Sequence, residues 1–242
     1  MSLNGLQFDK TNSWQNSNTR ILLCGKSFIA DTAGALYWPA EQTLIVSDPH
    51  LKSDEQISYP SISIYTHETR ATLIRIHDLA QHYDAKRIII LGGAAKGFKA
   101  DQKLDDENLQ RISELQKYYC CYWVMSEKAP DFFGELGSTV ADHFSLNGIT
   151  FRHKPTRAPI ANEIAGFMNP IARQKNGDRM MGQRCFISSN ARLIMPTLAD
   201  CGAGNNILGR EFDPMFAAGK LYVWILGTND VHPVAARLLE ED

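Results

Sequence analysis

The chain has 242 residues, of which 44% are hydrophobic and 21% are charged, a composition typical of a globular protein with one sizeable core. Its formal net charge of -2 excludes a global positive field that would draw the protein to nucleic acid or an anionic membrane, although a local basic patch is still compatible with it. No apolar run approaches the ~20 residues of a membrane span, and the polar N-terminus lacks the apolar core of a signal peptide.

Cysteine usage agrees with these exclusions. The cysteines are odd in number, form no C-x-x-C pair and include two direct neighbours; they are Cys24, Cys120, Cys121, Cys185 and Cys201. A reduced protein fits this pattern better than a disulfide framework does. We therefore expect a cytoplasmic protein with no membrane attachment.

Taken in chain order, the elements predict one α/β domain. Residues 1–20 form a polar lead-in that can be mobile, and residues 21–242 contain no repeat, low-complexity tract or linker. Short β runs over 21–48 are separated by Asp, Gly and Pro turns. A helix is predicted over 68–85, because its apolar residues recur at helical spacing.

The same alternation continues further along the chain. A buried strand over 86–93 ends in two glycines, a helix over 105–119 has acidic residues in its first turn, and a strand over 120–130 closes with a proline. This strand–helix–strand rhythm predicts a sheet with parallel pairing. After Gly137 the pattern changes to short β runs, which we expect over 143–153, 184–196 and 221–227.

Polar groups follow the predicted strands directly. In "TLIVSDPHLKS" a β-branched run gives way to Asp48-Pro49-His50. In parallel sheets, functional groups lie on loops beyond the carboxyl ends of the strands, and Asp and His are common ligands of ions such as Zn²⁺ or Mn²⁺. A turn-capping Asp beside a hydrogen-bonded His explains the same pair without a metal. The later "GGAAKGFK" lacks the spacing of a P-loop.

Six segments carry a further signal, because they occur in a fixed order. They are LIVSDPHL, ETRATLIRI, RIIILGG, WVMSEKAP, FRHKP and NEIAGFMNPIAR. Together with RCFISSNARLIMP, they resemble the motifs of calcineurin-like metallophosphoesterases, specifically the ligase-associated DNA damage response endonucleases, over residues 21–227. The resemblance implies two facing mixed β-sheets flanked by helices in a four-layer αββα sandwich. It also implies a phosphodiesterase that uses two divalent ions such as Mn²⁺.

Some metal-ligand positions of that family match and others do not. Asp48 and His50 match the family's D-L-H, and His153 matches its F-R-H-E-P. The bridging Asp of its L-G-D motif is Gly93 here. In place of its G-N-H-D turn the chain has Ser126-Glu127-Lys128-Ala129.

The resemblance thus puts Glu127 at the position of a metal-binding Asn and Lys128 at that of the catalytic His. The family's G-H-x-H motif has become Gly166-Phe167-Met168-Asn169, so Phe167 and Asn169 replace two His ligands. Three of seven expected ligands are left. Two dications ~4 Å apart repel by roughly 16 kcal/mol at an effective dielectric of ~20, and Gly93 supplies no bridging carboxylate to offset that repulsion.

Three hypotheses follow. The first is a catalytically silent binding or regulatory module that holds no stoichiometric metal. The second is a phosphodiesterase or nuclease with one ion on Asp48, His50 and His153, helped by Glu127 or Asn169. The third is a fold reused for unrelated small-molecule binding or for an interaction surface elsewhere on the molecule. A DNA ligase or helicase context follows from the resemblance alone, and homo-oligomerisation is left open.

Lys128 raises a separate question about charge. If Asp48 is buried without a metal, it needs a compensating charge or a raised pKa. An ammonium at position 128 that points into the same cavity would partner Asp48 or Glu127. The alternative is that Glu127 and Lys128 belong to a solvated turn.

Overall fold

The computed structural model describes residues 19–52, 62–93, 103–157, 161–177, 179–199, 204–216 and 221–241. Most of the polar lead-in predicted for residues 1–20 lies outside this part of the chain. Its last two residues, Thr19 and Arg20, begin strand β1.

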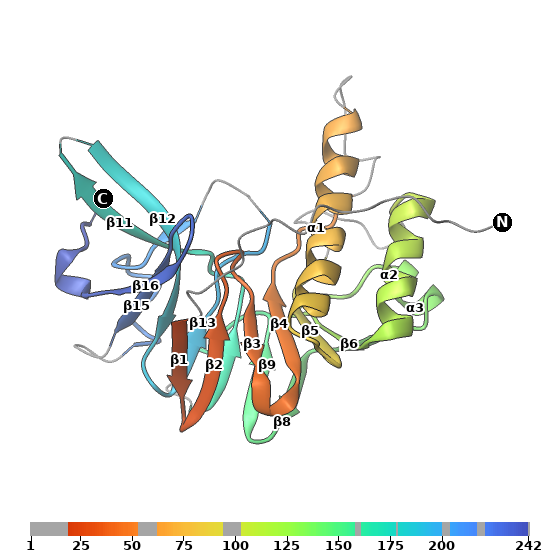
Figure 1. The fold of residues 1–242 in the computed structure, drawn as a ribbon, viewed down its shortest axis with the longest axis horizontal. Coiled ribbons are helices and arrows are strands. Elements are labelled where there is room, and N and C mark those ends of the chain that lie inside the picture. Colours follow the sequence, from red (N-terminus) through yellow and green to blue (C-terminus); the bar gives the residue numbers. More distant parts are fainter. Residues whose placement is uncertain are drawn as a thin grey trace.

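The first sheet has seven strands that lie side by side in chain order (Figure 1). They are β1 (Thr19–Leu23), β2 (Lys26–Ala30), β3 (Leu36–Trp38), β4 (Thr43–Ser47), β5 (Arg87–Leu91), β6 (Cys120–Val124) and β7 (Thr139–Ala141). The pairs from β1 to β4 are antiparallel, whereas β4, β5, β6 and β7 pair in parallel. The parallel pairing expected for the first half of the chain is therefore confirmed.

Three helices cover one face of this sheet: α1 (Ile62–His82), α2 (Asp106–Tyr118) and α3 (Asp131–Glu135). α2 begins where Asp105 accepts a hydrogen bond from the backbone N–H of Asn108, as an N-cap should. Apolar side chains of the helices pack on β4, β5 and β6, with Ile76 and Trp123 fully buried between the layers. Short 3₁₀ turns lie at Pro39–Glu41 and Ala236–Leu238.

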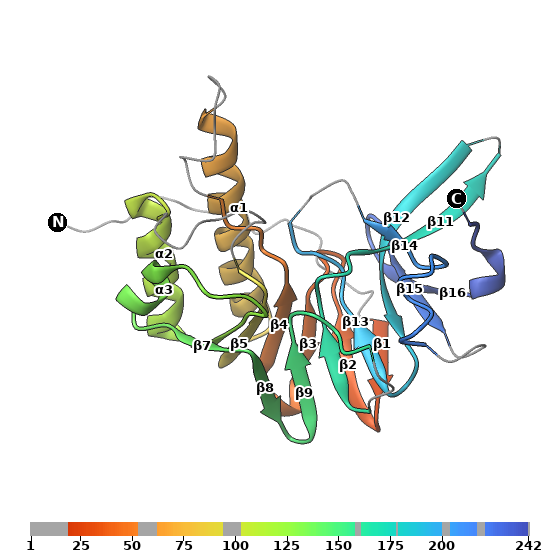
Figure 2. The same cartoon turned by 180° about the vertical axis from the view of Figure 1, so that it is seen from behind.

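The second sheet faces the first and is mixed (Figure 2). Its strands are β8 (His143–Leu146), β9 (Ile149–Arg152), β10 (Glu163–Ala165), β11 (Pro170–Asn176), β12 (Arg179–Ser188), β13 (Arg192–Ile194), β14 (Asn205–Asn206), β15 (Tyr222–Leu226) and β16 (Val231–Val234). β9, β10 and β13 are parallel neighbours, and the β11–β12 hairpin extends away from the body of the sheet. Between the two sheets lies an apolar core that includes Ile45, Leu91 and Phe151.

The two-sheet α/β architecture is as predicted, but the outermost layer differs. The far face of the second sheet buries Ile187 and Ile225 under Ile207, Phe212 and Leu239. Among the described residues this covering layer is irregular chain with a 3₁₀ turn and no α-helix. Of the four layers of the αββα arrangement, the first helical layer and the two sheets are regular, and the fourth layer is not helical in these residues. In the same residues, no helix has the length and apolar character required to cross a bilayer.

Candidate functional site

The site forms where β4 ends at Ser47. The Asp48 backbone N–H donates to the Leu91 carbonyl at 2.7 Å, and Asp48 then adopts a left-handed conformation with φ of +48°. Such a φ is uncommon outside glycine, and it turns the chain out of the sheet. The Asp48 side chain is held in a buried position as a result.

Both carboxylate oxygens of Asp48 accept hydrogen bonds from protein groups. Oδ1 lies 2.8 Å from Nε2 of His153, and Oδ2 accepts from the Ser47 hydroxyl at 2.5 Å and the Phe167 N–H at 2.8 Å. Burial by itself would raise the pKa of Asp48, but the hydrogen bond and charge of His153, with the Ser47 and Phe167 donors, hold it below its usual range. Asp48 is therefore an ionised, fully partnered carboxylate.

His153 comes from the other sheet, directly after β9. Its Nδ1 atom lies 3.1 Å from the Ser126 hydroxyl, on the loop after β6. Nε2 donates to Asp48 in either protonation state of the ring, whereas Nδ1 accepts from the Ser126 hydroxyl in the neutral imidazole and donates to it in the imidazolium. The loops after β4, β6 and β9 thus meet through His153.

Gly92 closes this group from the loop after β5. Its φ of +92° belongs to the region that favours glycine, and a Cβ there would lie 2.9 Å from Nε2 of His153 and 3.1 Å from Oδ1 of Asp48. Gly93 faces the opposite way, because a Cβ there would meet the end of the Met125 side chain and lie 3.6 Å from Phe133. The position assigned to the bridging Asp by resemblance thus faces the apolar core.

His50, the third matching ligand position, is half-buried close to this pair. Burial lowers its pKa, and the charges of Lys52 and His153 lower it further, against the opposing effect of Asp48. Within the described residues, no three or more His, Cys, Asp or Glu side chains are gathered in a way that could hold a metal ion.

Glu127 and Lys128, which by resemblance stand in place of the Asn and His of the G-N-H-D turn, lie on the surface. Glu127 accepts from Lys154 at 2.7 Å. Lys128 has a side chain that is 79% exposed, with Nζ 3.6 Å from an oxygen of Asp131. The idea that Lys128 points into the cavity as the partner of Asp48 is wrong. That role belongs to His153, and the solvated-turn alternative describes Lys128.

Phe167 is the best exposed apolar residue of the site, at 48%. Its ring meets His153 edge to face, with centroids 5.3 Å apart, and Nζ of Lys154 lies 4.6 Å from its centroid. The backbone φ of Phe167 is +68°, which is uncommon for a bulky residue and costs of order 1–3 kcal/mol. The backbone is therefore held in this form by its surroundings, including the bond from its N–H to Asp48.

Asn169 is connected to Asp48 through hydrogen bonds that both residues make with Thr197. Thr197 donates its N–H toward the Asn169 side-chain oxygen at 3.5 Å and its hydroxyl to the Asp48 carbonyl at 2.9 Å. Asn169 also has a positive φ, of +41°. It thus supports the loop geometry around Asp48.

Sequence reasoning missed three residues that matter here: Ser47, Lys154 and Thr197. Ser47 and Lys154 adjoin motif residues, so their proximity in sequence was a usable signal. Thr197 gave none, because it follows β13 and reaches Asp48 only through the packing of the two sheets.

The fold has a counterpart among solved structures. The crystal structure of Pseudomonas putida nuclease MPE matches this chain with a TM-score of 0.65 and 19% sequence identity, over 90% of this chain and 100% of that one. The fold is of the metallophosphoesterase type. No protein-family model and no curated protein matches the chain.

The donor set can be tested against the two ions implied by a metallophosphoesterase fold. Two-metal sites hold ions ~3.5–4 Å apart on shared carboxylate and imidazole ligands. In the part of the chain that the structure describes, the one carboxylate at the centre is Asp48, which already accepts from three protein donors, and Gly93 faces away. The Phe167 ring has no metal-ligating atom, and the Lys154 ammonium beside it would repel a cation. These residues do not fit a two-ion centre.

Proposed function

We propose that this protein is a catalytically silent member of the metallophosphoesterase fold that binds a phosphodiester, such as DNA, without cleaving it. A DNA-repair setting is part of this proposal and draws on the likeness to a nuclease. Basic side chains support a role in anion binding, since His50, Lys52, His153 and Lys154 lie on the loops around Asp48. Lys52 and Lys154 each pair with a surface glutamate, which a phosphate would have to displace.

One observation carries the proposal: the Asp48 carboxylate is satisfied by His153, Ser47 and the Phe167 N–H. A divalent ion would have to displace these donors, and the neighbouring positions offer it glycine and phenylalanine. Protein sites for such ions usually supply three or four ligands. Removing a single positioned catalytic group commonly costs ~100-fold or more in rate, and by resemblance several are replaced here.

The first test measures metal content and turnover together. Protein purified without chelator is assayed by elemental analysis, and then for cleavage of bis(p-nitrophenyl) phosphate with added Mn²⁺. We expect less than a tenth of an equivalent of transition metal and background turnover, equal in wild type, Asp48→Ala and His232→Ala. His232 is a matched control, since it also pairs with an Asp but lies on β16 with a side chain that is 42% exposed.

Bound metal or Mn²⁺-dependent cleavage would contradict the proposal. About one equivalent of Mn, Fe or Zn, or Mn²⁺-dependent cleavage, that is lost in Asp48→Ala and kept in His232→Ala would contradict silence and favour a single-ion nuclease. Binding is measured separately, by fluorescence anisotropy of labelled DNA in EDTA. Binding that weakens severalfold in Lys154→Ala supports the binding role, and absence of binding in EDTA contradicts it.

A further inference from the structure

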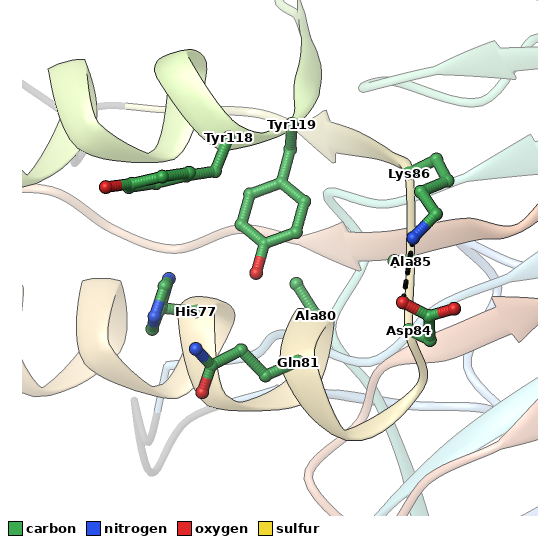
Figure 3. Close-up of a pocket in the computed structure, with 8 residues that line it drawn as sticks. All are labelled: His77, Ala80, Gln81, Asp84, Ala85, Lys86, Tyr118 and Tyr119. Carbon is green, nitrogen blue, oxygen red and sulfur yellow. Dashed lines mark hydrogen bonds and ion pairs between the residues drawn. The ribbon is translucent and has the colours of Figure 1, made fainter.

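A second recess lies on the helical side of the first sheet, at the end opposite to the candidate site. It is an open slot of about 580 Å³ between α1 and the C-terminal end of α2, within the ~300–1,000 Å³ of small-molecule sites. Figure 3 shows Tyr118 and Tyr119 on one wall and His77 and Gln81 facing them. The proposed function does not involve this slot.

The topology separates the two sites. Asp84 and Lys86 precede β5 and Tyr119 precedes β6, so the slot lies at the amino-terminal ends of these parallel strands. The candidate site lies beyond their carboxyl ends. Five residues of strand span about 17 Å, so a ligand in the slot does not touch Asp48.

Flat aromatic surfaces form the entrance of the slot. Tyr118 is the last residue of α2 and is 65% exposed, which is high for so large a ring. His77 and Tyr119 meet edge to face, with centroids 6.0 Å apart and an interplanar angle of 71°. An exposed ring next to half-buried rings is the kind of surface on which bases stack in sequence-tolerant nucleic-acid sites.

Polar groups line the interior between these rings. The Tyr119 hydroxyl points down toward Gln81 in Figure 3, and the Gln81 amide offers a donor and an acceptor side by side. Burial, followed by the charge of Cys121, raises the pKa of Tyr119, so its hydroxyl keeps its proton. A Gln amide matches the paired donor and acceptor at one edge of adenine.

The charged side chains around the slot favour binding of a neutral or anionic ligand over binding of a cation. Asp84 is 2.8 Å from Lys86, so its carboxylate is paired. Nζ of Lys117 lies 5.6 Å from the centroid of Tyr118, which places a positive charge at the entrance. An aromatic cage holds a quaternary ammonium over the face of a ring, and here the Lys117 ammonium beside the Tyr118 ring would repel it. Phosphate attached to a base would instead be attracted to Lys117.

We propose that this slot binds a nucleobase, stacked against Tyr118 and hydrogen-bonded by Gln81 and Tyr119, with the attached phosphate toward Lys117. The base can belong to a free nucleotide or to single-stranded nucleic acid, since both present the same ring and phosphate. An adenine-type edge fits the Gln81 amide best.

The test compares AMP, adenosine, choline and a short single-stranded oligonucleotide by equilibrium dialysis and fluorescence anisotropy. We expect AMP to bind more tightly than adenosine, and choline not to bind. Tyr118→Ala should weaken binding about tenfold or more, as loss of one stacking ring does. The matched control is Tyr222→Ala, which removes a tyrosine of similar exposure (47%) from β15 in the other sheet. UMP is measured alongside AMP, and Gln81→Ala should reduce the ratio of the affinity for AMP to that for UMP.

The outcomes distinguish a free nucleotide from single-stranded nucleic acid as the ligand, and both from a cationic ligand. Binding of the oligonucleotide without AMP would assign the slot to single strands, provided that Tyr118→Ala removes it. The oligonucleotide is measured in the Lys154→Ala background, which weakens the binding proposed for the candidate site. AMP binding, or oligonucleotide binding in that background, that is unchanged by Tyr118→Ala would overturn the proposal. So would tighter binding of choline, or no binding of any nucleic-acid probe at millimolar concentration. Asp48→Ala should leave slot binding unaltered, so failure here is distinct from failure of the proposed function.

Discussion

Nε2 of His153 lies 2.8 Å from Oδ1 of Asp48, although 105 positions separate them in the chain. Asp48 follows β4 of the first sheet and His153 follows β9 of the second, so this contact ties the two sheets together at the mouth of the site. The same two residues match metal-ligand positions by resemblance, and here they partner each other. The pair therefore has a structural role that can be measured directly.

His153→Ala should lower the free energy of unfolding by about 2 kcal/mol. Breaking a buried ion pair costs ~3–5 kcal/mol, and here Asp48 keeps Ser47 and the Phe167 N–H as donors, which reduces the loss. Urea unfolding in EDTA gives the value, with His232→Ala expected within ~0.5 kcal/mol of wild type. Equal stability of His153→Ala and wild type would show that the contact contributes nothing.

The positive φ of Phe167 predicts an unusual order of stability. Phe167→Gly should be more stable than Phe167→Ala by about 1 kcal/mol, because both lose the ring but only glycine adopts a φ of +68° without steric cost. Met168, the next residue, is the control, since it has no positive φ and should show alanine more stable than glycine. The same order at both positions would contradict the left-handed conformation of Phe167.

A buried ion pair beneath the site should matter more than its exposed counterparts. Nε of Arg192 lies 2.7 Å from Glu163, with side chains 1% and 0% exposed, and Arg192 also donates to Thr156, three residues after His153. Arg192→Met leaves the buried Glu163 with the two Thr156 donors and with Arg152 at 3.7 Å. We therefore expect a loss of ~3 kcal/mol in unfolding free energy, at the lower end of the ~3–5 kcal/mol for a broken buried ion pair.

The control for this pair is Lys103→Met, which removes one partner of an ion pair that is 2.6 Å long and about half exposed. It should cost less than about 1 kcal/mol. Losses of equal size in the two variants would mean that burial does not set the strength of the Arg192 pair.

The two neighbouring cysteines should react very differently. Cys120 is exposed, whereas Cys121 is buried, and burial, with the charge of Cys120, raises the Cys121 pKa to about 12. Because the thiolate is the reactive form, iodoacetamide at pH 8 should label Cys120 and leave Cys121 intact. Mass spectrometry of the shared peptide checks this, and Cys120→Ser should abolish its labelling. Labelling that persists in Cys120→Ser would contradict the burial of Cys121.

Much of the fold followed from the sequence because buried β-branched runs such as β4 and β5 end in recognisable loops. The order of those loops also located Asp48 and His153 at one site. The β11–β12 hairpin was harder to foresee, since the first part of β12 is exposed on both faces and shows no alternation. A two-residue period appears only where one face is buried.

The directions of side chains on turns were the least predictable part of the site. Lys128 occupies the expected loop but points to solvent, and Gly93 occupies the expected strand end but faces Met125. Position in a motif fixes which loop a residue lies on. The direction of the side chain depends on φ and ψ values that packing elsewhere decides.

The last prediction concerns restoring the family's ligands. The substitutions are Gly93→Asp, Glu127→Asn, Lys128→His, Ala129→Asp, Phe167→His and Asn169→His. A Cβ at Gly93 would meet the Met125 side chain, so Gly93→Asp should destabilise by ~1–3 kcal/mol and direct its carboxylate toward the apolar core. We expect the restored protein to fold and still bind less than a tenth of an equivalent of Mn²⁺.

Met125→Ala tests whether metal binding is prevented by the loss of ligand side chains or by a changed backbone geometry at the strand end. It makes room beside position 93, so the Gly93→Asp, Met125→Ala double variant should lose less stability than the sum of the single variants, by roughly 0.5–3 kcal/mol of coupling. If the restored protein takes up two equivalents of metal once Met125 is shortened, only side chains separate this chain from a two-ion site. If metal stays absent while the stability is recovered, the strand-end geometry itself differs, because a carboxylate at position 93 still faces away from Asp48. The direction of Gly93 makes this second result the expected one.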